Sequence, residues 1–115
     1  MKKFYVLSML AIVSLTLAYC SAAKKAARIP KSTYAANLST VISTSCAPCH
    51  IPALGGNKKA YDNYANVKTD IDEMLRRIEL NPTDKGFMPF KRIEKLPVEV
   101  IDAFKKWKAD GMLEN

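Results

Sequence analysis

Residues 32–50 read STYAANLSTVISTSCAPCH, a stretch that joins an amphipathic segment to a group of reactive side chains. Its first part carries apolar residues at helical spacing, namely Tyr34, Leu38, Val41 and Ile42. This pattern predicts a helix with one buried face, and Ser32 or Thr33 can cap its N-terminus. The helix is expected to run directly into Cys46.

The stretch ends in Cys46-Ala47-Pro48-Cys49-His50, a C-x-x-C-H string. This string is the attachment motif of c-type haem. Two thiols three positions apart on a compact turn can each bond one vinyl group of the porphyrin. The next side chain is then aimed at the iron from the same side. The sequence therefore predicts one covalent haem c, held by Cys46 and Cys49, with His50 as an iron ligand.

Two other interpretations of the same residues stay open. A thioredoxin-type redox pair needs a preceding strand in a βαβ unit, and the pattern before Cys46 is helical. A structural zinc site needs four ligands, whereas Cys46, Cys49 and His50 supply three and the chain has no other histidine. Both interpretations are less favoured than haem.

The middle of the chain also has a helical pattern. A short helix is expected around Tyr61 and Tyr64. A longer one is expected to begin at Thr69, with acidic residues in its first turn, and to end at Pro82. Its apolar face consists of Ile71, Met74, Leu75 and Ile78.

The last helix is expected to begin at Pro97 and to end at Gly111, after a loop over residues 83–96. Its apolar face consists of Val100, Phe104 and Trp107. No stretch alternates in the manner of a strand, and no internal repeat is present. The predicted fold class is all-α, with three to four helices.

The beginning of the chain has the pattern of an export leader. Two lysines precede an apolar run over residues 4–18, which is shorter than the ~20 residues of a membrane span. Residues 1–23 are therefore interpreted as a signal peptide or lipoprotein leader. Residues 24–31 would be a linker, and residues 32–115 the folded domain. The predicted location is outside the cytoplasm, in a bacterial periplasm.

The leader offers two places for cleavage and one for retention. Residues 17–20, LAYC, are similar to a lipobox that would lipidate Cys20, and the small residues 21–23, SAA, suit ordinary cleavage near Ala23. We favour lipidation at Cys20, because it accounts for the odd one of three cysteines. A cleaved soluble form and an uncleaved N-terminal anchor are the alternatives.

Composition sets the outer limits. The chain has 115 residues and a formal net charge of +7, with 49% hydrophobic and 25% charged residues. This length allows one domain and excludes large enzyme folds. The positive charges are scattered among negative ones, so nucleic acid is not an expected partner.

Taken together, the motif and the helices around it resemble a small class I monohaem cytochrome c. The resemblance covers nearly the whole of residues 32–115. It implies a compact fold wrapped around one haem that is held by Cys46 and Cys49. It further implies axial ligation of the iron by His50 and a methionine.

The methionine can be chosen from the surrounding residues; the five in the chain are Met1, Met9, Met74, Met88 and Met112. The first two belong to the leader. Met74 lies on an apolar helix face and is expected to fill the core, and Met112 lies near an end that is expected to fray. Met88 sits in a loop and is followed by Pro89, as family members commonly present their ligand. We therefore expect Met88 to be the second axial ligand.

The remaining polar and aromatic residues have less specific roles. Trp107 is expected in the core, packed near Tyr34 and Leu38. Donors to haem propionates are to be sought among Asn57, Tyr61, Tyr64, Arg76 and Arg77. A hydrogen-bond acceptor should fix the His50 ring, but Pro52 is too close to it to match the proline that offers its carbonyl in many relatives.

These residues lead to an expected function and two alternatives. With His50 and Met88 both bound to the iron, the protein would carry one electron at a time between exported or membrane-bound redox proteins. It would not be an enzyme, and would act as a monomer on partners with acidic docking surfaces. The alternatives are a haem-based sensor with a labile sixth ligand, and a disulfide oxidoreductase or unrelated interaction module.

Overall fold

The segment that leads into the cysteine motif is helical in the computed structural model, which describes residues 30–115. It begins with one turn of π-helix, η1 (Tyr34–Leu38), and continues as α2 (Ser39–Ser45). The Thr33 hydroxyl accepts a hydrogen bond from the Ala36 backbone N–H at 3.2 Å. The predicted helix and its Thr33 cap are therefore confirmed, and the apolar side chains Tyr34, Leu38 and Ile42 are buried.

The long middle helix, α3 (Tyr64–Glu79), begins one turn earlier than the sequence predicted. The Asn63 side chain caps it by accepting from the Asn66 N–H at 3.0 Å. Thr69 lies inside α3 rather than at its start, and its hydroxyl donates to the Ala65 carbonyl of the preceding turn. The acidic residues therefore lie beyond the first turn, and the predicted separate short helix is wrong, since Tyr64 opens α3 itself. The buried face of α3 is Val67, Ile71, Met74, Leu75 and Ile78.

The last helix, α4 (Val98–Ala109), agrees with the sequence at both ends to within one or two residues. Pro97 is its N-cap residue rather than its first helical residue. At the other end, Gly111 adopts a left-handed φ of 100°, which a side chain would strain. Phe104 and Trp107 on its inner face are fully buried, as the pattern predicted.

The C-terminal residues are fixed to the rest of the domain rather than frayed. The Leu113 carbonyl accepts from the Tyr34 N–H and from the Trp107 indole N–H, both at 2.8 Å. The Tyr64 hydroxyl donates to the Met112 carbonyl at 3.0 Å. The first turn of a helix leaves backbone N–H groups without partners, and here the C-terminal segment supplies the acceptor. The expectation that Met112 lies in a frayed end is therefore wrong.

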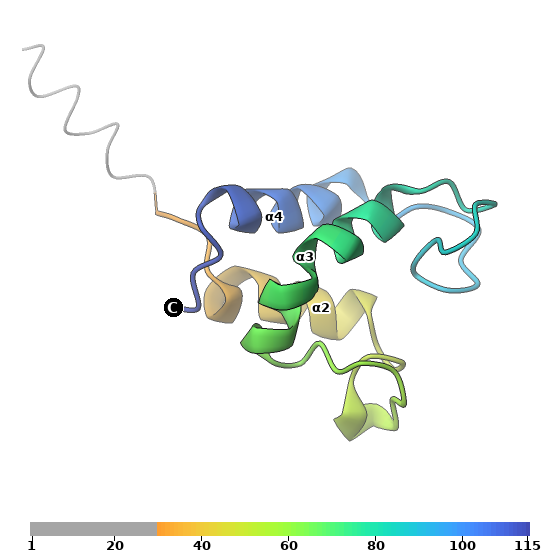
Figure 1. Cartoon of the computed structure of the whole chain (residues 1–115), viewed down its shortest axis with the longest axis horizontal. Coiled ribbons are helices and arrows are strands. Elements are labelled where there is room, and N and C mark those ends of the chain that lie inside the picture. Colours follow the sequence, from red (N-terminus) through yellow and green to blue (C-terminus); the bar gives the residue numbers. More distant parts are fainter. Residues whose placement is uncertain (1–29) are drawn as a thin grey trace, which may run out of the picture. The chain divides into compact units, whose positions relative to one another are not determined.

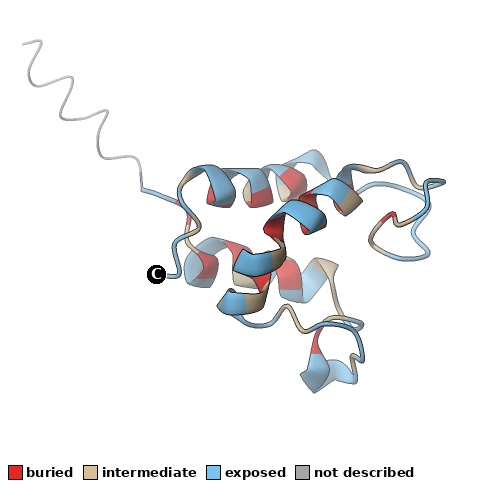
Figure 2. Cartoon of the chain, viewed as in Figure 1, coloured by how far each residue is buried: buried red, intermediate tan, exposed pale blue. Residues whose placement is uncertain are grey.

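The core lies where η1, α3 and α4 meet. Helices α3 and α4 pack on each other, and η1 packs on α4 (Figure 1). The Trp107 ring lies 6.4 Å from the Tyr34 ring and 6.3 Å from the Tyr64 ring, centroid to centroid. This confirms Trp107 as a core residue, and its indole N–H is already bonded to Leu113. Figure 2 shows the buried positions of the helices facing one another.

Residues 31–115 form one compact unit that is all-α, as predicted. The only β-type backbone pairing in the described part of the chain is an isolated bridge between Thr33 and Leu113. Within residues 30–115, no helix combines the length and the apolar character that crossing a membrane requires. The leader, Cys20 and most of the predicted linker lie outside the described residues.

Candidate functional site

The motif residues form a compact turn that continues the hydrogen bonding of α2. The Cys46 N–H donates to the Ile42 carbonyl at 2.8 Å, and the His50 N–H donates to the Cys46 carbonyl at 3.1 Å. Cys46 packs against the core, whereas Cys49 is exposed, and both are free thiols. The structure thus brings two thiols and one imidazole together on a single turn.

The His50 ring is held from one side. Its Nδ1 lies 2.7 Å from the Lys59 carbonyl oxygen. A carbonyl can only accept, so Nδ1 must carry the proton, and Nε2 is the nitrogen whose lone pair can bind a metal. The ring also stacks on the Tyr61 ring, at 4.5 Å between centroids and 15° between planes. The Lys59 carbonyl is therefore the acceptor that the sequence could not name.

Gly56 allows the chain to pass close over the motif. A Cβ atom at this position would lie 2.6 Å from the Cys49 carbonyl oxygen and 2.8 Å from that of Ile51, with the Pro48 oxygen also in contact. The Gly56 N–H donates to the Ile51 carbonyl at 3.1 Å. The absence of a side chain lets the following residues reach His50.

Gly56→Ala is expected to destabilise the domain by about 1–3 kcal/mol, the usual cost of forcing an extra carbon into a packed site. Three backbone oxygens surround the new methyl group, and backbone cannot move aside as a flexible side chain can. Chemical denaturation measures the change. Gly55→Asn is the control, because the space beside Gly55 is open and asparagine tolerates its left-handed φ of 83°. Equal loss in both variants would contradict the close approach.

Met88 lies in the loop between α3 and α4, as predicted, and is half-buried against the core. Its backbone N–H donates to the Arg77 carbonyl at 3.3 Å, near the end of α3. The preceding Phe87 is buried. In Figure 1 this loop and the turn that follows α2 lie on the same side of the domain. Met74, by contrast, is buried on the inner face of α3, which confirms its role as a core residue.

Three large apolar side chains are exposed in these two segments. Leu54, in the short helix η2 (Pro52–Leu54), is 60% exposed, and Phe90 and Ile93, in the loop of Met88, are 68% and 87% exposed. The donor set of two thiols and one imidazole with Nε2 available fits a covalently held haem, and Met88 lies in a separate loop.

Neither competing interpretation of the cysteines gains support. Burial raises the pKa of the Cys46 thiol to about 11, whereas redox-active cysteines have lowered pKa values. Residues 30–115 also contain no strand before Cys46, so the βαβ setting is missing. No three His, Cys, Asp or Glu residues in the described part of the chain converge on a metal site.

Most of the expected propionate donors already have partners. Arg76 and Arg77 both bind the Glu73 carboxylate, at 2.7 Å and 2.6 Å. Together they hold the pKa of Glu73 down to about 2, mainly through these hydrogen bonds. The Tyr61 hydroxyl donates to Asp70, and that of Tyr64 to Met112. Asn57 is exposed. No propionate donor is singled out by this geometry.

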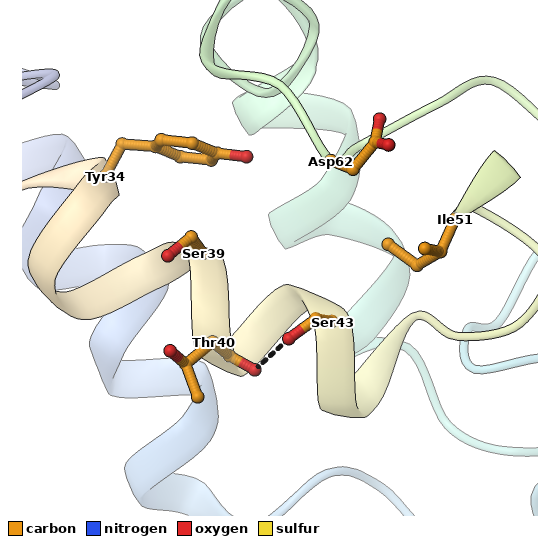
Figure 3. A pocket seen from close by; sticks show the side chains of 6 residues that line it. All are labelled: Tyr34, Ser39, Thr40, Ser43, Ile51 and Asp62. Carbon is orange, nitrogen blue, oxygen red and sulfur yellow. Dashed lines mark hydrogen bonds between the residues drawn. The ribbon is translucent and has the colours of Figure 1, made fainter. Parts of the chain in front are cut away.

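A separate hollow lies beside α2 and contains none of the motif residues. Its lining is Tyr34, Ser39, Thr40, Ser43, Ile51 and Asp62. Figure 3 shows the four residues of the first helical segment on one side, with Ile51 and Asp62 on the other. The Ser43 hydroxyl is already bonded to the Thr40 carbonyl at 2.9 Å. This open hollow does not belong to the candidate site.

Comparison with protein-family models, with curated proteins and with solved structures found no match. The chemistry of the site is therefore the basis for the function proposed below.

Proposed function

We propose that this protein is a monohaem c-type cytochrome that carries single electrons. The observation that supports this most strongly is the state of the motif turn. Two free thiols and an imidazole lie on one turn, and the hydrogen bond from Nδ1 to Lys59 leaves Nε2 of His50 available for iron. A fixed tautomer and ring orientation are what a metal-binding histidine requires.

In this proposal Cys46 and Cys49 would hold the haem covalently through their sulfur atoms, and His50 and Met88 would bind its iron. When bound, the haem would supply reversible one-electron chemistry at its iron, and ligation by Met88 would raise its reduction potential. The chain fixes the orientation of the ligands and the environment of the group. With His50 and Met88 both bound to the iron, no position would be left for a substrate, so the protein would be a carrier and not an enzyme.

The distribution of charge supports an acidic redox partner. The lysines of α4 are paired with carboxylates: Lys105 with Glu79, Lys106 with Asp110 and Lys108 with Asp72. The cations in the loop of Met88 form no ion pairs within the described residues; they are Lys85, Lys91, Arg92 and Lys95. The loop also holds Asp84 and Glu94, so cations outnumber anions there by two, and this excess would steer an acidic protein toward the loop. The export leader is consistent with partners outside the cytoplasm.

A haem-based sensor is the second candidate. The Met88 backbone N–H makes one long hydrogen bond of 3.3 Å, and the residue lies in a loop made of turns rather than helix. A ligand held by such a loop could leave the iron and open a binding position. This candidate shares the haem and its attachment with the carrier and differs in the strength of the sixth ligand.

The visible spectrum of the exported protein tests the proposal. We expect haem absorption that survives acid-acetone extraction, sharp low-spin bands, and the weak long-wavelength band of a thioether bound to ferric iron. Ready binding of CO at neutral pH would favour the sensor instead. Absence of haem absorption from protein made together with the haem-attachment machinery would exclude both.

A further inference from the structure

The short segment of residues 59–61 holds the His50 side chain and its backbone together. The Lys59 carbonyl accepts from Nδ1 at 2.7 Å, and the Tyr61 ring stacks on the imidazole. The Tyr61 N–H donates to the His50 carbonyl at 2.9 Å. The orientation of the imidazole thus depends on where this segment lies.

The segment is in turn fixed to helix α3, and every one of its residues takes part. The Lys59 ammonium lies 2.8 Å from the Asp70 carboxylate, and the Tyr61 hydroxyl donates to the same carboxylate at 3.0 Å. Between them, the Ala60 carbonyl accepts from the Asn66 side chain at 2.9 Å. Asp70 therefore binds both residues that contact the His50 ring.

At neutral pH, Asp70, Lys59 and Tyr61 have the protonation states that their hydrogen bonds require. The Lys59 ammonium, followed by the Tyr61 hydroxyl, keeps the pKa of Asp70 below its ordinary value against the effect of burial. Burial, then the bond to Asp70, raises the pKa of Tyr61 to about 12. Asp70 is thus an anion that accepts two hydrogen bonds, and Tyr61 keeps its proton. The Asp70 side chain is only 21% exposed.

We propose that Asp70 is a positioning residue for the iron ligand: from α3 it fixes residues 59–61, and through them the orientation and hydrogen bonding of His50. This inference rests on the proposed function and extends it to a residue that does not touch the histidine. A strong bond from Nδ1–H to a carbonyl makes the imidazole a better electron donor. A better donor stabilises ferric iron. The reduction potential should therefore be lower when Asp70 holds residues 59–61 in place than when these bonds are broken.

Three variants test this in the haem-loaded protein. Asp70→Asn removes the anion, Lys59→Met removes the cation but keeps the backbone carbonyl, and Tyr61→Phe removes only a hydroxyl. The control is Asp72→Asn, which removes an equal charge from α3 at a residue that pairs with Lys108 and is 78% exposed. Two quantities are measured: the reduction potential, and the exchange rate of the His50 Nδ1 proton by NMR of the reduced protein.

Loss of positioning and simple electrostatics predict opposite changes in the reduction potential of Lys59→Met. If Asp70 and Lys59 position the ligand, both variants raise the potential and speed proton exchange about tenfold, because a charge-assisted bond no longer holds the segment. Tyr61→Phe gives smaller changes in the same directions, and Asp72→Asn gives none. If only charge matters, Asp70→Asn raises the potential and Lys59→Met lowers it, with exchange unchanged.

Opposite changes in reduction potential for Asp70→Asn and Lys59→Met, with unchanged proton exchange, would overturn the inference. So would a reduction potential and a proton exchange rate that stay at wild-type values in all three variants. Tyr61→Phe and Lys59→Met keep the test decisive if Asp70→Asn does not fold. A wild-type protein that shows no haem absorption would overturn the proposed function and this inference together. Unchanged variants of a protein with an intact haem spectrum would overturn only the role of Asp70.

Discussion

The double variant Cys46→Ala with Cys49→Ala is expected to lose covalent haem completely and to fold poorly. Both thioether bonds disappear, and a non-covalent haem would depend on His50 and Met88 alone. Cys46 packs against the core, so its truncation also removes packing there. A domain of this size has little stability to spare. Acid-acetone extraction and thermal unfolding followed by circular dichroism measure the two losses.

The single variants are the matched controls. Cys49→Ala removes the exposed thiol and Cys46→Ala the one packed on the core. Each leaves one thioether, so both should keep extraction-resistant haem, with the larger loss of stability in Cys46→Ala. Haem that resists extraction from the double variant would show that attachment does not use these cysteines.

The helices were predictable because their signals are local. The first and last helices have continuous apolar spacing, and Thr33 and Gly111 mark their ends by chemistry that acts within one turn. The start of α3 was misplaced although Tyr64 and Val67 continue the apolar spacing of Ile71. Thr69, with acidic residues directly after it, has the pattern of a helix start as well. Capping by Asn63 decides the boundary there.

The C-terminal segment was missed for a different reason. Its bonds join residues far apart in the sequence: Leu113 to Tyr34, and Met112 to Tyr64. No local signal reports such contacts. Composition near a chain end suggests fraying, and in this domain the unpartnered N–H groups of the first helical turn prevent it.

The candidate site was predictable in the same uneven way. Cys46, Cys49 and His50 form a contiguous string whose spacing carries the chemistry. The acceptor of the His50 proton is a backbone carbonyl, and every residue has one, so nothing in the sequence marks Lys59. Asp70 is one of the acidic residues that the sequence placed in the first turn of the middle helix. Only the fold places its carboxylate beside Lys59 and Tyr61.

Met88→Ala is expected to convert the carrier into a protein with an open iron position. Without the thioether, the reduction potential falls, and CO or cyanide binds readily. Stability also falls, by roughly 2 kcal/mol, because methionine-to-alanine truncations in cores cost about 2–5 kcal/mol and the half-buried Met88 lies at the low end of that range. Potentiometry, CO titration and chemical denaturation of the haem-loaded variant measure these effects.

Met74→Leu is the matched control, because Met74 is the methionine of the folded domain that is buried in the core. A volume-conserving swap there should cost less than about 1.5 kcal/mol and leave the spectrum unchanged. The two variants separate ligation from packing, since both remove a thioether but only one is expected to remove it from the iron. If Met74→Leu loses the thioether band while Met88→Ala keeps it, α3 and not the loop supplies the sixth ligand. If neither variant changes the spectrum, neither Met88 nor Met74 binds the iron, and the case for an electron carrier weakens in favour of a sensor.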